Sequence, residues 1–478
     1  MKKNRLDGMK RTIRLIEGFL EVFTLSVAYY IVWRMGYERS DGFPAYYGNG
    51  KYVLAGVYGI LVIMLFMNFE GFKFGYLKAV ESFASQVIAL FIVNFITYLQ
   101  LSLIANVMIS PLPIVMLMIL DAVIALFFSF VYNYLYHVIY PPKNMVMIFG
   151  NDNAIDLKFK MDTRSDKYRI SKLISTDEGF EAICKQIVGY DAVIINDVTA
   201  GIRNDLLKYC YKNGIRTYVA PKMTDIILKG ATDISLFDTP LLLVRGRGLT
   251  SAQRFAKRLM DIILSAIALI ILSPVLILVS LAIKIEDGGP ILFKQDRVTT
   301  GGKVFQILKF RSMIPNAELG GKAQPAVDND PRITKVGKFI RSTRIDEFPQ
   351  LINILKGDMS IVGPRPERVE HARKYSKLIP EFDFRLSVKG GLTGYAQVYG
   401  KYNTTPYDKL RLDLMYIENY SIMLDIKLIL MTIRIMLKRE STEGFNERRE
   451  IERKKAEILK QLHKDHEELE DETPVGTK

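Results

Sequence analysis

The chain has 478 residues, with 65 Lys and Arg against 51 Asp and Glu, a formal charge of +14, and 49% hydrophobic residues. This composition excludes a disordered chain, a collagen-like fibre and a small disulfide scaffold, and the length predicts about two to four domains. Cys184 and Cys210 form no CxxC pair, so neither a zinc site nor a redox pair is predicted. Strong positive charge with high hydrophobicity fits either a nucleic-acid binder with a large core or a membrane protein with basic cytoplasmic parts.

Four apolar runs in the first third of the chain are each long enough to cross a bilayer, which takes about 17–25 residues. They cover Leu15–Trp33, Tyr52–Phe69, Gln86–Met108 and Pro113–Tyr136. Six Lys and Arg lie within residues 1–14, whereas the loop before Pro113 is uncharged, so the positive-inside rule places the N-terminus in the cytoplasm. Residues 1–142 are therefore predicted to form a four-helix transmembrane bundle. Asp121 is interpreted as a helix–helix contact, with a transport pathway as the alternative.

Residues 143–245 have a different character, because short apolar strands alternate with amphipathic helices. The pattern predicts strands at 145–150, 168–175, 191–198 and 215–221, and helices at 180–189 and 206–214. Such alternation is typical of a small parallel, Rossmann-like α/β unit. Only Gly150 marks its first turn, where dinucleotide binders need G-x-G-x-x-G, so a structural or regulatory domain is favoured over a cofactor site.

A fifth apolar run, Ile262–Ile283, is interrupted by Pro274 directly after Ser273. Proline removes a backbone hydrogen bond and kinks a helix, and the Ser273 hydroxyl can serve the freed backbone groups. Both flanks of the run are basic, and a spanning helix would place one of them outside. We therefore expect a re-entrant helix over residues 255–285 that enters and leaves on the cytoplasmic side, rather than a fifth span.

Two segments near the C-terminus complete the outline. Residues 424–437 carry Lys427 and Arg434 among apolar residues, which predicts a helix on the membrane surface, with a core helix of the preceding domain as the alternative. Residues 441–478 are mostly charged and polar, with a thin apolar stripe that predicts a short solvated helix or weak coiled coil. The catalytic part of the chain is thus placed at residues 246–440.

The adjacent acids Asp346 and Glu347 lie in the densest charged segment. Thr343 and Asp346 have the spacing of a helix capping box, and acids in a first turn suit the helix dipole. The following apolar residues would form a helix that ends at Gly357. On spacing alone, a purely structural role as a helix start competes with catalysis.

Arginines on both sides of the acid pair favour catalysis. Arg341 and Arg344 precede it, and Arg365 and Arg368 follow in and after a rigid Pro-Arg-Pro turn. Arginine matches phosphate oxygens in a bidentate way. Acids enclosed by arginines suit metal-assisted phosphoryl transfer, in which carboxylates hold Mg²⁺, cations neutralise the transferred group, and a carboxylate can attack phosphorus.

Several motifs in order carry a family resemblance. They are KQDRVTTGGKVFQILKFRSM (294–313), DPRIT (330–334), IDEFPQLINILKGDMSIVGPRPE (345–367), GLTGYAQVYG (391–400) and LDLMYIENYS (412–421). From Ala252 to Leu437 the chain resembles the bacterial sugar transferase family, the monotopic polyprenyl-phosphate phosphoglycosyl transferases. With its bundle and α/β unit it is similar to the large members, the undecaprenyl-phosphate hexose-1-phosphate transferases that start exopolysaccharide, capsule or O-antigen synthesis.

The resemblance implies a mechanism for the acid pair. Asp346 would attack the β-phosphorus of a UDP-sugar, release UMP and form an aspartyl phosphosugar, which undecaprenyl phosphate then attacks. Glu347 would assist in proton handling or in positioning, and Mg²⁺ would sit against Asp346. Glucose and galactose are the commonest sugars for this architecture. Transport of lipid-linked sugar and a membrane-tethered anion-binding protein are the alternative functions.

The resemblance also implies a substrate site and a location. Lys309, Arg311 and Arg365 are expected near the phosphates, with Arg344 and Arg368 as further candidates. Ser273 and Pro274 match the family's re-entrant break, whereas Thr299 stands where the family usually has glycine. The protein is expected in the bacterial cytoplasmic membrane with its catalytic domain facing the cytoplasm. Its expected partners are the UDP-sugar, undecaprenyl phosphate and membrane lipids, with a homodimer left open and no role for nucleic acid.

Overall fold

The structure is a computed structural model that describes residues 2–38, 49–150, 154–236, 238–244, 246, 248–315, 330–400 and 404–436, with side chains from Met9 to Ile435 within these ranges. The chain divides into two compact units, residues 1–142 and 143–478. The predicted C-terminal helix at 441–478 lies outside the described residues.

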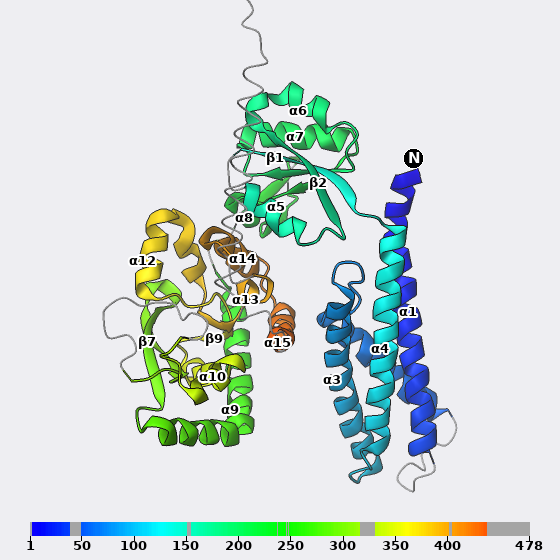
Figure 1. The fold of residues 1–478 in the computed structure, drawn as a ribbon, viewed down its shortest axis with the longest axis vertical. Coiled ribbons are helices and arrows are strands. Elements are labelled where there is room, and N and C mark those ends of the chain that lie inside the picture. Colours follow the sequence, from blue (N-terminus) through cyan, green and yellow to red (C-terminus); the bar gives the residue numbers. More distant parts are fainter. Residues whose placement is uncertain are drawn as a thin grey trace, which may run out of the picture. The chain divides into compact units, whose positions relative to one another are not determined.

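The first unit consists of long helices (Figure 1). They are α1 (Lys2–Gly36), α2 (Gly50–Asn68), α3 (Ala79–Ala105) and α4 (Leu112–Ile139). Each of the four predicted apolar runs coincides with a helix, although α3 ends at Ala105, before the predicted end at Met108. Five helices in the described part of the chain are long and apolar enough to cross a membrane, namely Met9–Gly36 of α1, then α2, α3, α4 and the later helix Ser251–Asp287. Large apolar side chains such as Phe19 and Leu103 remain exposed on the outer faces of these helices, as lipid contact requires.

Polar side chains line the interior of this helical unit. Asp121 on α4 accepts hydrogen bonds from the Tyr58 hydroxyl at 2.7 Å and from the Asn94 amide at 2.8 Å. Ser129 donates to Gln86 at 2.8 Å. Interhelical hydrogen bonds of this kind hold membrane helices together, where the hydrophobic effect cannot. The interpretation of Asp121 as a helix–helix contact is confirmed.

The second unit begins with a parallel α/β sheet of strand order β2-β1-β3-β4. Its strands are β1 (Lys143–Phe149), β2 (Tyr168–Ser175), β3 (Ala192–Asn196) and β4 (Arg216–Val219). The helices are α5 (Ala154–Asp162), α6 (Phe180–Ile187), α7 (Ala200–Lys212) and α8 (Met223–Lys229). Residues of α6 and α7 pack on one face of the sheet and residues of α5 on the other. The predicted parallel sheet is confirmed.

The α/β region contains one helix that the sequence did not predict, and its structure explains the glycine in its first turn. Helix α5 was not predicted, because its apolar residues Ile155, Leu157, Phe159 and Met161 alternate with the period of a strand. Packing explains why glycine occupies position 150, since a Cβ there would lie 2.6 Å from the carbonyl oxygen of Asp197. The glycine therefore permits close approach of two loops and does not by itself indicate a phosphate site.

A small antiparallel hairpin, β5 (Thr232–Ile234) and β6 (Leu241–Leu243), precedes the long helix α9 (Ser251–Asp287). Figure 1 shows α9 bending into two arms. Pro274 lies inside the helix, and the Ser273 hydroxyl donates at 2.8 Å to the carbonyl of Ile270, which lacks its usual N–H donor. The segment is therefore one continuous helix, Ser251–Asp287, with the predicted break residues Ser273 and Pro274 inside it.

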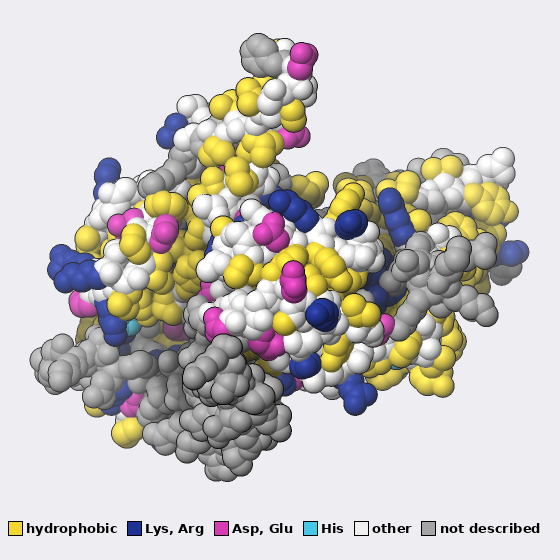
Figure 2. Space-filling model, turned by 90° about the horizontal axis from the view of Figure 1, so that it is seen from above, with side chains coloured by type: hydrophobic (Ala, Val, Ile, Leu, Met, Phe, Trp, Pro, Cys, Tyr) yellow, Lys and Arg dark blue, Asp and Glu magenta, His cyan; other side chains and the backbone are white. Residues whose placement is uncertain are grey.

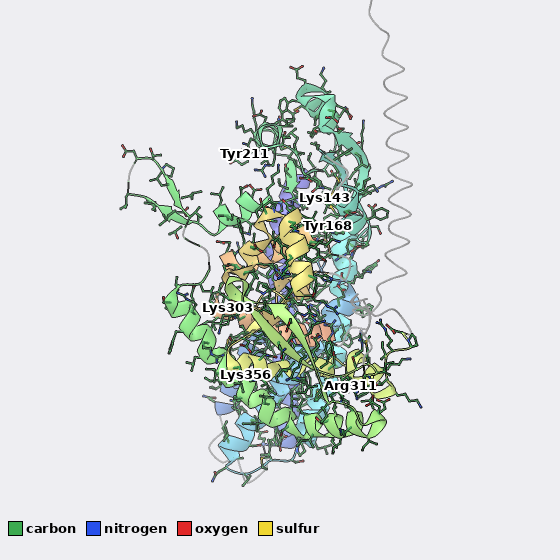
Figure 3. The ribbon with its side chains drawn as sticks, turned by 90° about the vertical axis from the view of Figure 1, so that its left-hand side faces the viewer. Lys143, Tyr168, Tyr211, Lys303, Arg311 and Lys356 are labelled. Carbon is green, nitrogen blue, oxygen red and sulfur yellow. The ribbon has the colours of Figure 1, made fainter. Side chains whose placement is uncertain are left out.

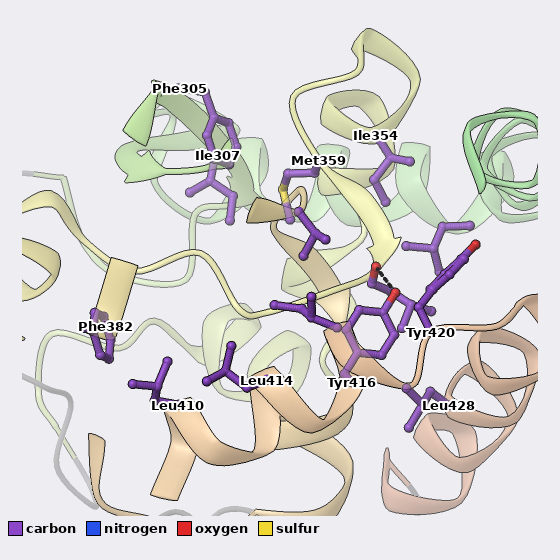
Figure 4. Close-up of a cluster of buried hydrophobic side chains, with 14 of the residues drawn as sticks. Phe305, Ile307, Ile354, Met359, Phe382, Leu410, Leu414, Tyr416, Tyr420 and Leu428 are labelled. Carbon is purple, nitrogen blue, oxygen red and sulfur yellow. Dashed lines mark hydrogen bonds between the residues drawn. The ribbon is translucent and has the colours of Figure 1, made fainter. Parts of the chain in front are cut away.

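The rest of the second unit is mostly helical and begins with the antiparallel hairpin β7 (Leu292–Val298) and β8 (Val304–Phe310). The elements that follow are α10 (Lys335–Ser342), the 3-10 turn η4 (Ile345–Glu347), α11 (Gln350–Lys356), β9 (Ser360–Val362), α12 (Val369–Leu378), the 3-10 segment η5 (Pro380–Ser387), β10 (Gly391–Thr393), α13 (Tyr395–Tyr399), α14 (Pro406–Glu418) and α15 (Ile422–Met436). Their shared core includes Ile354, Phe382, Leu414 and Tyr416 (Figure 4).

Helix α15 belongs to this core on one of its faces. Leu428 is completely buried, and Arg434 and the carboxylate of Asp425 are also buried. The opposite face exposes Met423 and Ile433. The core-helix alternative is therefore correct for one face, while the other face keeps the apolar character expected of a membrane-surface helix.

Basic residues do not gather into one large patch on the face of the molecule shown in Figure 2. There, Lys and Arg side chains lie singly or in small groups between apolar and acidic ones. A groove that tracks a nucleic-acid backbone needs a continuous basic surface. The face drawn in Figure 2 shows no continuous basic surface of this kind.

Candidate active site

Asp346 and Glu347 lie in the 3-10 turn η4, between α10 and α11. The predicted capping box is wrong, because the Thr343 hydroxyl donates at 2.9 Å to the carbonyl of Phe339 at the end of α10. Arg344, in the left-handed region with φ +56°, reverses the chain direction before the acids. The two carboxylates thus project from a tight turn and not from the first turn of a regular helix.

Helix α11 follows directly and anchors this turn to the core. It begins after Pro349 and ends at Gly357, whose φ of +95° is the left-handed cap that the sequence predicted. Ile354 on α11 is fully buried. The side chain of Arg258 on α9 donates to the carbonyls of Ile354 and Leu355 at 2.6 and 2.7 Å, which satisfies orphan acceptors at the end of the helix.

Two cations converge on Glu347. Its Oε1 accepts from Lys309 Nζ at 2.8 Å and from an Arg365 guanidinium nitrogen at 2.5 Å. Burial alone would raise the pKa of Glu347, but the charges of Arg365 and Lys309 outweigh it and hold the pKa well below its usual range. Glu347 therefore stays ionised, with its Oε1 held by both cations.

Asp346 has the opposite environment. Burial raises the pKa of its carboxyl, the charge of Lys309 opposes that rise, and the neighbouring charge of Glu347 adds to it. Within the described part of the chain the carboxylate accepts no hydrogen bond and forms no ion pair, although Lys309, Arg341 and Arg365 act on it electrostatically. Paired acids with pKa values pushed apart are typical of sites where each has its own task.

The Pro-Arg-Pro turn that carries Arg365 is held by its carbonyl groups. All four carbonyls from residue 364 to residue 367 accept a hydrogen bond of 2.9–3.0 Å. The donors are Gly391 N to Pro364, Arg385 to Arg365, Arg297 to Pro366 and Val298 N to Glu367. A turn with every carbonyl bonded places the Arg365 side chain firmly against Glu347.

Arg297 is a site residue that the sequence pattern did not identify as one. Its guanidinium donates at 3.0 Å to the carbonyl of Pro366 in the Pro-Arg-Pro turn. Burial, together with the charges of Arg365 and Arg368, lowers its pKa to about 10. Its backbone also pairs with that of Arg368 in an isolated β-bridge. The signal available in the sequence was its position inside the motif KQDRV, close to the phosphate-site candidates.

Two predicted phosphate-binding residues are not brought to the acid pair. Arg311 forms an ion pair with Asp287 at the end of α9, and Figure 3 shows Arg311 and Lys303 at opposite ends of β8. Among the described residues, Arg311 makes no hydrogen bond or ion pair with Asp346 or Glu347. Arg344 contributes its left-handed backbone conformation, and its side chain makes no hydrogen bond or ion pair within the described residues.

Thr299 shows how the chain replaces the glycine usual at this position. Its φ of −126° is extended and needs no glycine. The buried hydroxyl donates at 3.0 Å to the carbonyl of Asp358 and accepts at 3.2 Å from the backbone N–H of Gly390. The left-handed positions of the loop are Gly301 and Gly302, at φ +66° and +78°. Thr299 therefore needs no left-handed backbone conformation, and its hydroxyl joins the loop to two other segments.

Gly363→Ala is expected to destabilise the protein by about 1–3 kcal/mol, because a Cβ at this position would lie 2.3 Å from the carbonyl oxygen of Lys389. Chemical unfolding of the purified protein measures the change. Gly201→Ala is the control, since no atom lies within 4 Å of a Cβ there. An equal stability of the two variants would contradict the close approach of β9 and β10.

Comparisons with known proteins identify related sequences. A family model described as bacterial sugar transferase matches residues 252–439. A UDP-glucose:undecaprenyl-phosphate glucose-1-phosphate transferase of Caulobacter vibrioides is 41% identical over 186 residues, which are 38% of this chain and 69% of that relative. A protein of the same name from Escherichia coli is 41% identical over 211 residues, 43% of this chain and 44% of that relative.

A further relative differs in its sugar. A UDP-N-acetylgalactosamine-undecaprenyl-phosphate N-acetylgalactosaminephosphotransferase of Aeromonas hydrophila is 39% identical over 257 residues, 52% of this chain and 60% of that relative. The chain spans about half the length of the Escherichia and Aeromonas relatives that it matches. The motifs, the acid pair with its cations, and the match over most of the Caulobacter relative lead to one conclusion: the chain belongs to the bacterial sugar transferase family.

Proposed function

We propose that this protein transfers a hexose 1-phosphate from a UDP-sugar to undecaprenyl phosphate and releases UMP. The observation that carries the proposal is the acid pair, in which Glu347 is held ionised by Lys309 and Arg365 while Asp346 has no hydrogen-bond partner in the described chain. The names of the relatives, two glucose-1-phosphate transferases and an N-acetylgalactosaminephosphotransferase, support the reaction class.

Asp346 is the nucleophile in this proposal. Its carboxylate attacks the β-phosphorus of the UDP-sugar, the bond from that phosphorus to the bridging oxygen breaks, and UMP leaves with that oxygen. An oxygen of undecaprenyl phosphate then attacks the same phosphorus, and the Asp346 carboxylate leaves. Because both substrates are anions, splitting the reaction in this way lets one cation-rich site serve each half in turn.

Glu347 acts as a positioning residue and not as a proton carrier. A carboxylate whose pKa is held well below its usual range does not take up a proton near neutral pH. Its charge instead keeps Lys309 and Arg365 in place, and those two cations stabilise charge that develops on the transferred phosphoryl group. Of the two roles implied by the family resemblance, the geometry favours positioning.

Mg²⁺ fits the site as an ion shared with the substrate. Within the described residues no group of three or more His, Cys, Asp or Glu could hold a metal ion. Glu347 is engaged with its two cations, whereas Asp346 offers a carboxylate without hydrogen-bond partners. Mg²⁺ commonly binds through one or two carboxylates and substrate phosphates. When bound, Mg²⁺ would neutralise charge on the diphosphate, with Asp346 as its ligand from this chain.

The membrane arrangement belongs to the same proposal. The α1–α4 unit anchors the chain in the bacterial cytoplasmic membrane, and bent α9 enters and leaves on the cytoplasmic side. Its apolar side chains Ile270, Ile271 and Ile285 are at least 69% exposed, which suits contact with lipid. Such a helix holds the acid pair near the headgroups, where the lipid phosphate is presented.

The function is tested by UMP release from solubilised protein with undecaprenyl phosphate and Mg²⁺. UDP-glucose, UDP-galactose and UDP-N-acetylgalactosamine are compared, and we expect one of them to be turned over. A truncation that begins near Leu249 and keeps UMP release would set transport aside as the core function. Absence of UMP release from all UDP-sugars would contradict the proposal and favour the anion-binding alternative.

The acidic limb of the pH–rate profile is expected to report Asp346. Because the attacking carboxylate must be ionised, the rate falls as the pH falls through the raised pKa of Asp346, while Glu347 stays ionised to lower pH. Lys309→Met removes the cation that most opposes this rise, so the limb moves to higher pH. The profile of kcat/KM for UMP release measures the shift. Lys303→Met, at the exposed end of β8, is the control, and an unmoved limb in Lys309→Met would contradict the assignment.

A further inference from the structure

Arg385, in η5, lies directly behind the Pro-Arg-Pro turn and is only 2% exposed. Its guanidinium binds Asp413 on α14 through two nitrogens, at 2.9 and 2.7 Å. One of those nitrogens also donates at 2.9 Å to the main-chain carbonyl of Arg365. The Arg385 guanidinium further lies 5.0 Å from the centre of the Phe382 ring. A single rigid side chain therefore joins the core to the backbone of a proposed substrate-binding residue.

A second ion pair supports the first. Glu367, the residue directly after the turn, pairs with Lys409 on α14, and its carboxylate lies 3.6 Å from the Arg385 guanidinium. Asp413 and Lys409 are one helical turn apart on the same helix. The turn is thus tied to α14 at two points, by Arg385 at its second residue and by Glu367 directly after it.

Stability alone does not account for this network. Removing two charges from water costs several kcal/mol per ion, and well-packed apolar residues often serve a core as well or better. The guanidinium, however, is a planar fork that can bind a carboxylate and a carbonyl at once, which a lysine ammonium or an apolar side chain cannot reproduce with the same geometry. The feature unique to Arg385 in this network is its bond to the Arg365 carbonyl.

We propose that Arg385, held by Asp413, is a positioning residue that sets where the Arg365 guanidinium meets the substrate phosphates. This inference rests on the proposed function. The side chain of Arg365 extends to Glu347 Oε1 at 2.5 Å, while its carbonyl is held from the other side by Arg385. A displacement of the turn by about 1 Å would carry the Arg365 guanidinium with it, and misplacement on that scale can cost roughly 100-fold in rate.

The test is a double-mutant cycle in the full-length protein. Arg385→Lys is expected to weaken the affinity for UDP and to lower kcat/KM for UMP release by roughly 10- to 100-fold. Arg365→Gln is expected to lower both by at least as much. In the Arg365→Gln background Arg385→Lys is expected to have no further effect, because the residue through which it acts is gone. Asp413→Asn, close in shape to the native residue, is expected to give a smaller loss that also disappears in that background.

Binding of UDP keeps the cycle measurable even where turnover is lost. Arg203→Lys is the matched control, since Arg203 forms an ion pair with Asp225 in the α/β region and contacts none of these residues. A purely structural role predicts that the Arg385→Lys loss persists in the Arg365→Gln background, and that outcome overturns the inference. Unchanged UDP affinity in Arg365→Gln also overturns it. Failure of the proposed function is distinct, because the wild-type protein would then release no UMP from any UDP-sugar.

Discussion

Asp346→Asn is expected to lower UMP release by at least about 1,000-fold, because an amide cannot form the acyl phosphate through which both half-reactions pass. The substitution removes no hydrogen bond within the described chain, so folding and membrane insertion are expected to be unchanged. The measurement is a single turnover of the purified protein with UDP-sugar. In the wild-type protein without lipid acceptor, mass spectrometry is expected to find a hexose phosphate on the peptide that contains Asp346.

Asp296→Asn is the matched control for this prediction. Asp296 is an exposed aspartate on β7, and its substitution is expected to leave the rate within about twofold of wild type. Full activity in purified Asp346→Asn would remove the nucleophile assignment. A hexose phosphate found on another residue would do the same while leaving the transfer reaction itself intact.

Glu347→Gln is expected to lower kcat/KM by roughly 100-fold and to destabilise the protein by about 1–3 kcal/mol. The neutral amide leaves Lys309 and Arg365 without the charge that holds them, at a site where Glu347 is only 14% exposed. The expected loss of stability is smaller than for breaking a fully buried ion pair, because the Arg365 side chain is 36% exposed and partly screened by solvent. Kinetics of UMP release and chemical unfolding measure the two effects separately.

Glu347→Asp tests whether the charge or the geometry matters more. It keeps the negative charge but shortens the side chain by one methylene, so it is expected to recover most of the stability and only part of the rate. If Glu347→Gln retained wild-type kcat/KM, the two cations would not depend on Glu347 for their placement. If Glu347→Asp were as inactive as Glu347→Gln but fully stable, the rate would depend on the distance from the carboxylate to Lys309 and Arg365 and not on its charge alone.

Local pattern was sufficient for much of the fold. The long apolar runs became α1–α4, since about 20 apolar residues suit a membrane helix whatever surrounds them. The parallel sheet followed from strands that alternate with helices, and α11 ended where Gly357 offered a left-handed cap. Local sequence patterns gave wrong predictions where they were ambiguous. The strand-like alternation of α5 concealed a helix, and Thr343 does not form the predicted capping box.

Some residues of the site can be identified from the sequence, whereas others can be identified only from the tertiary structure. The sequence by itself determined the acid pair, the arginines near it and the family, because these are contiguous motifs. Only the tertiary structure decided that Arg311 pairs with Asp287, and that Arg297 and Arg385 hold the Pro-Arg-Pro turn. It also decided that two adjacent carboxylates have opposite pKa shifts, because Lys309 and Arg365, 38 and 18 residues away, converge on Glu347 and not on Asp346. Electrostatic partners depend on distance in space, which one-dimensional spacing does not contain.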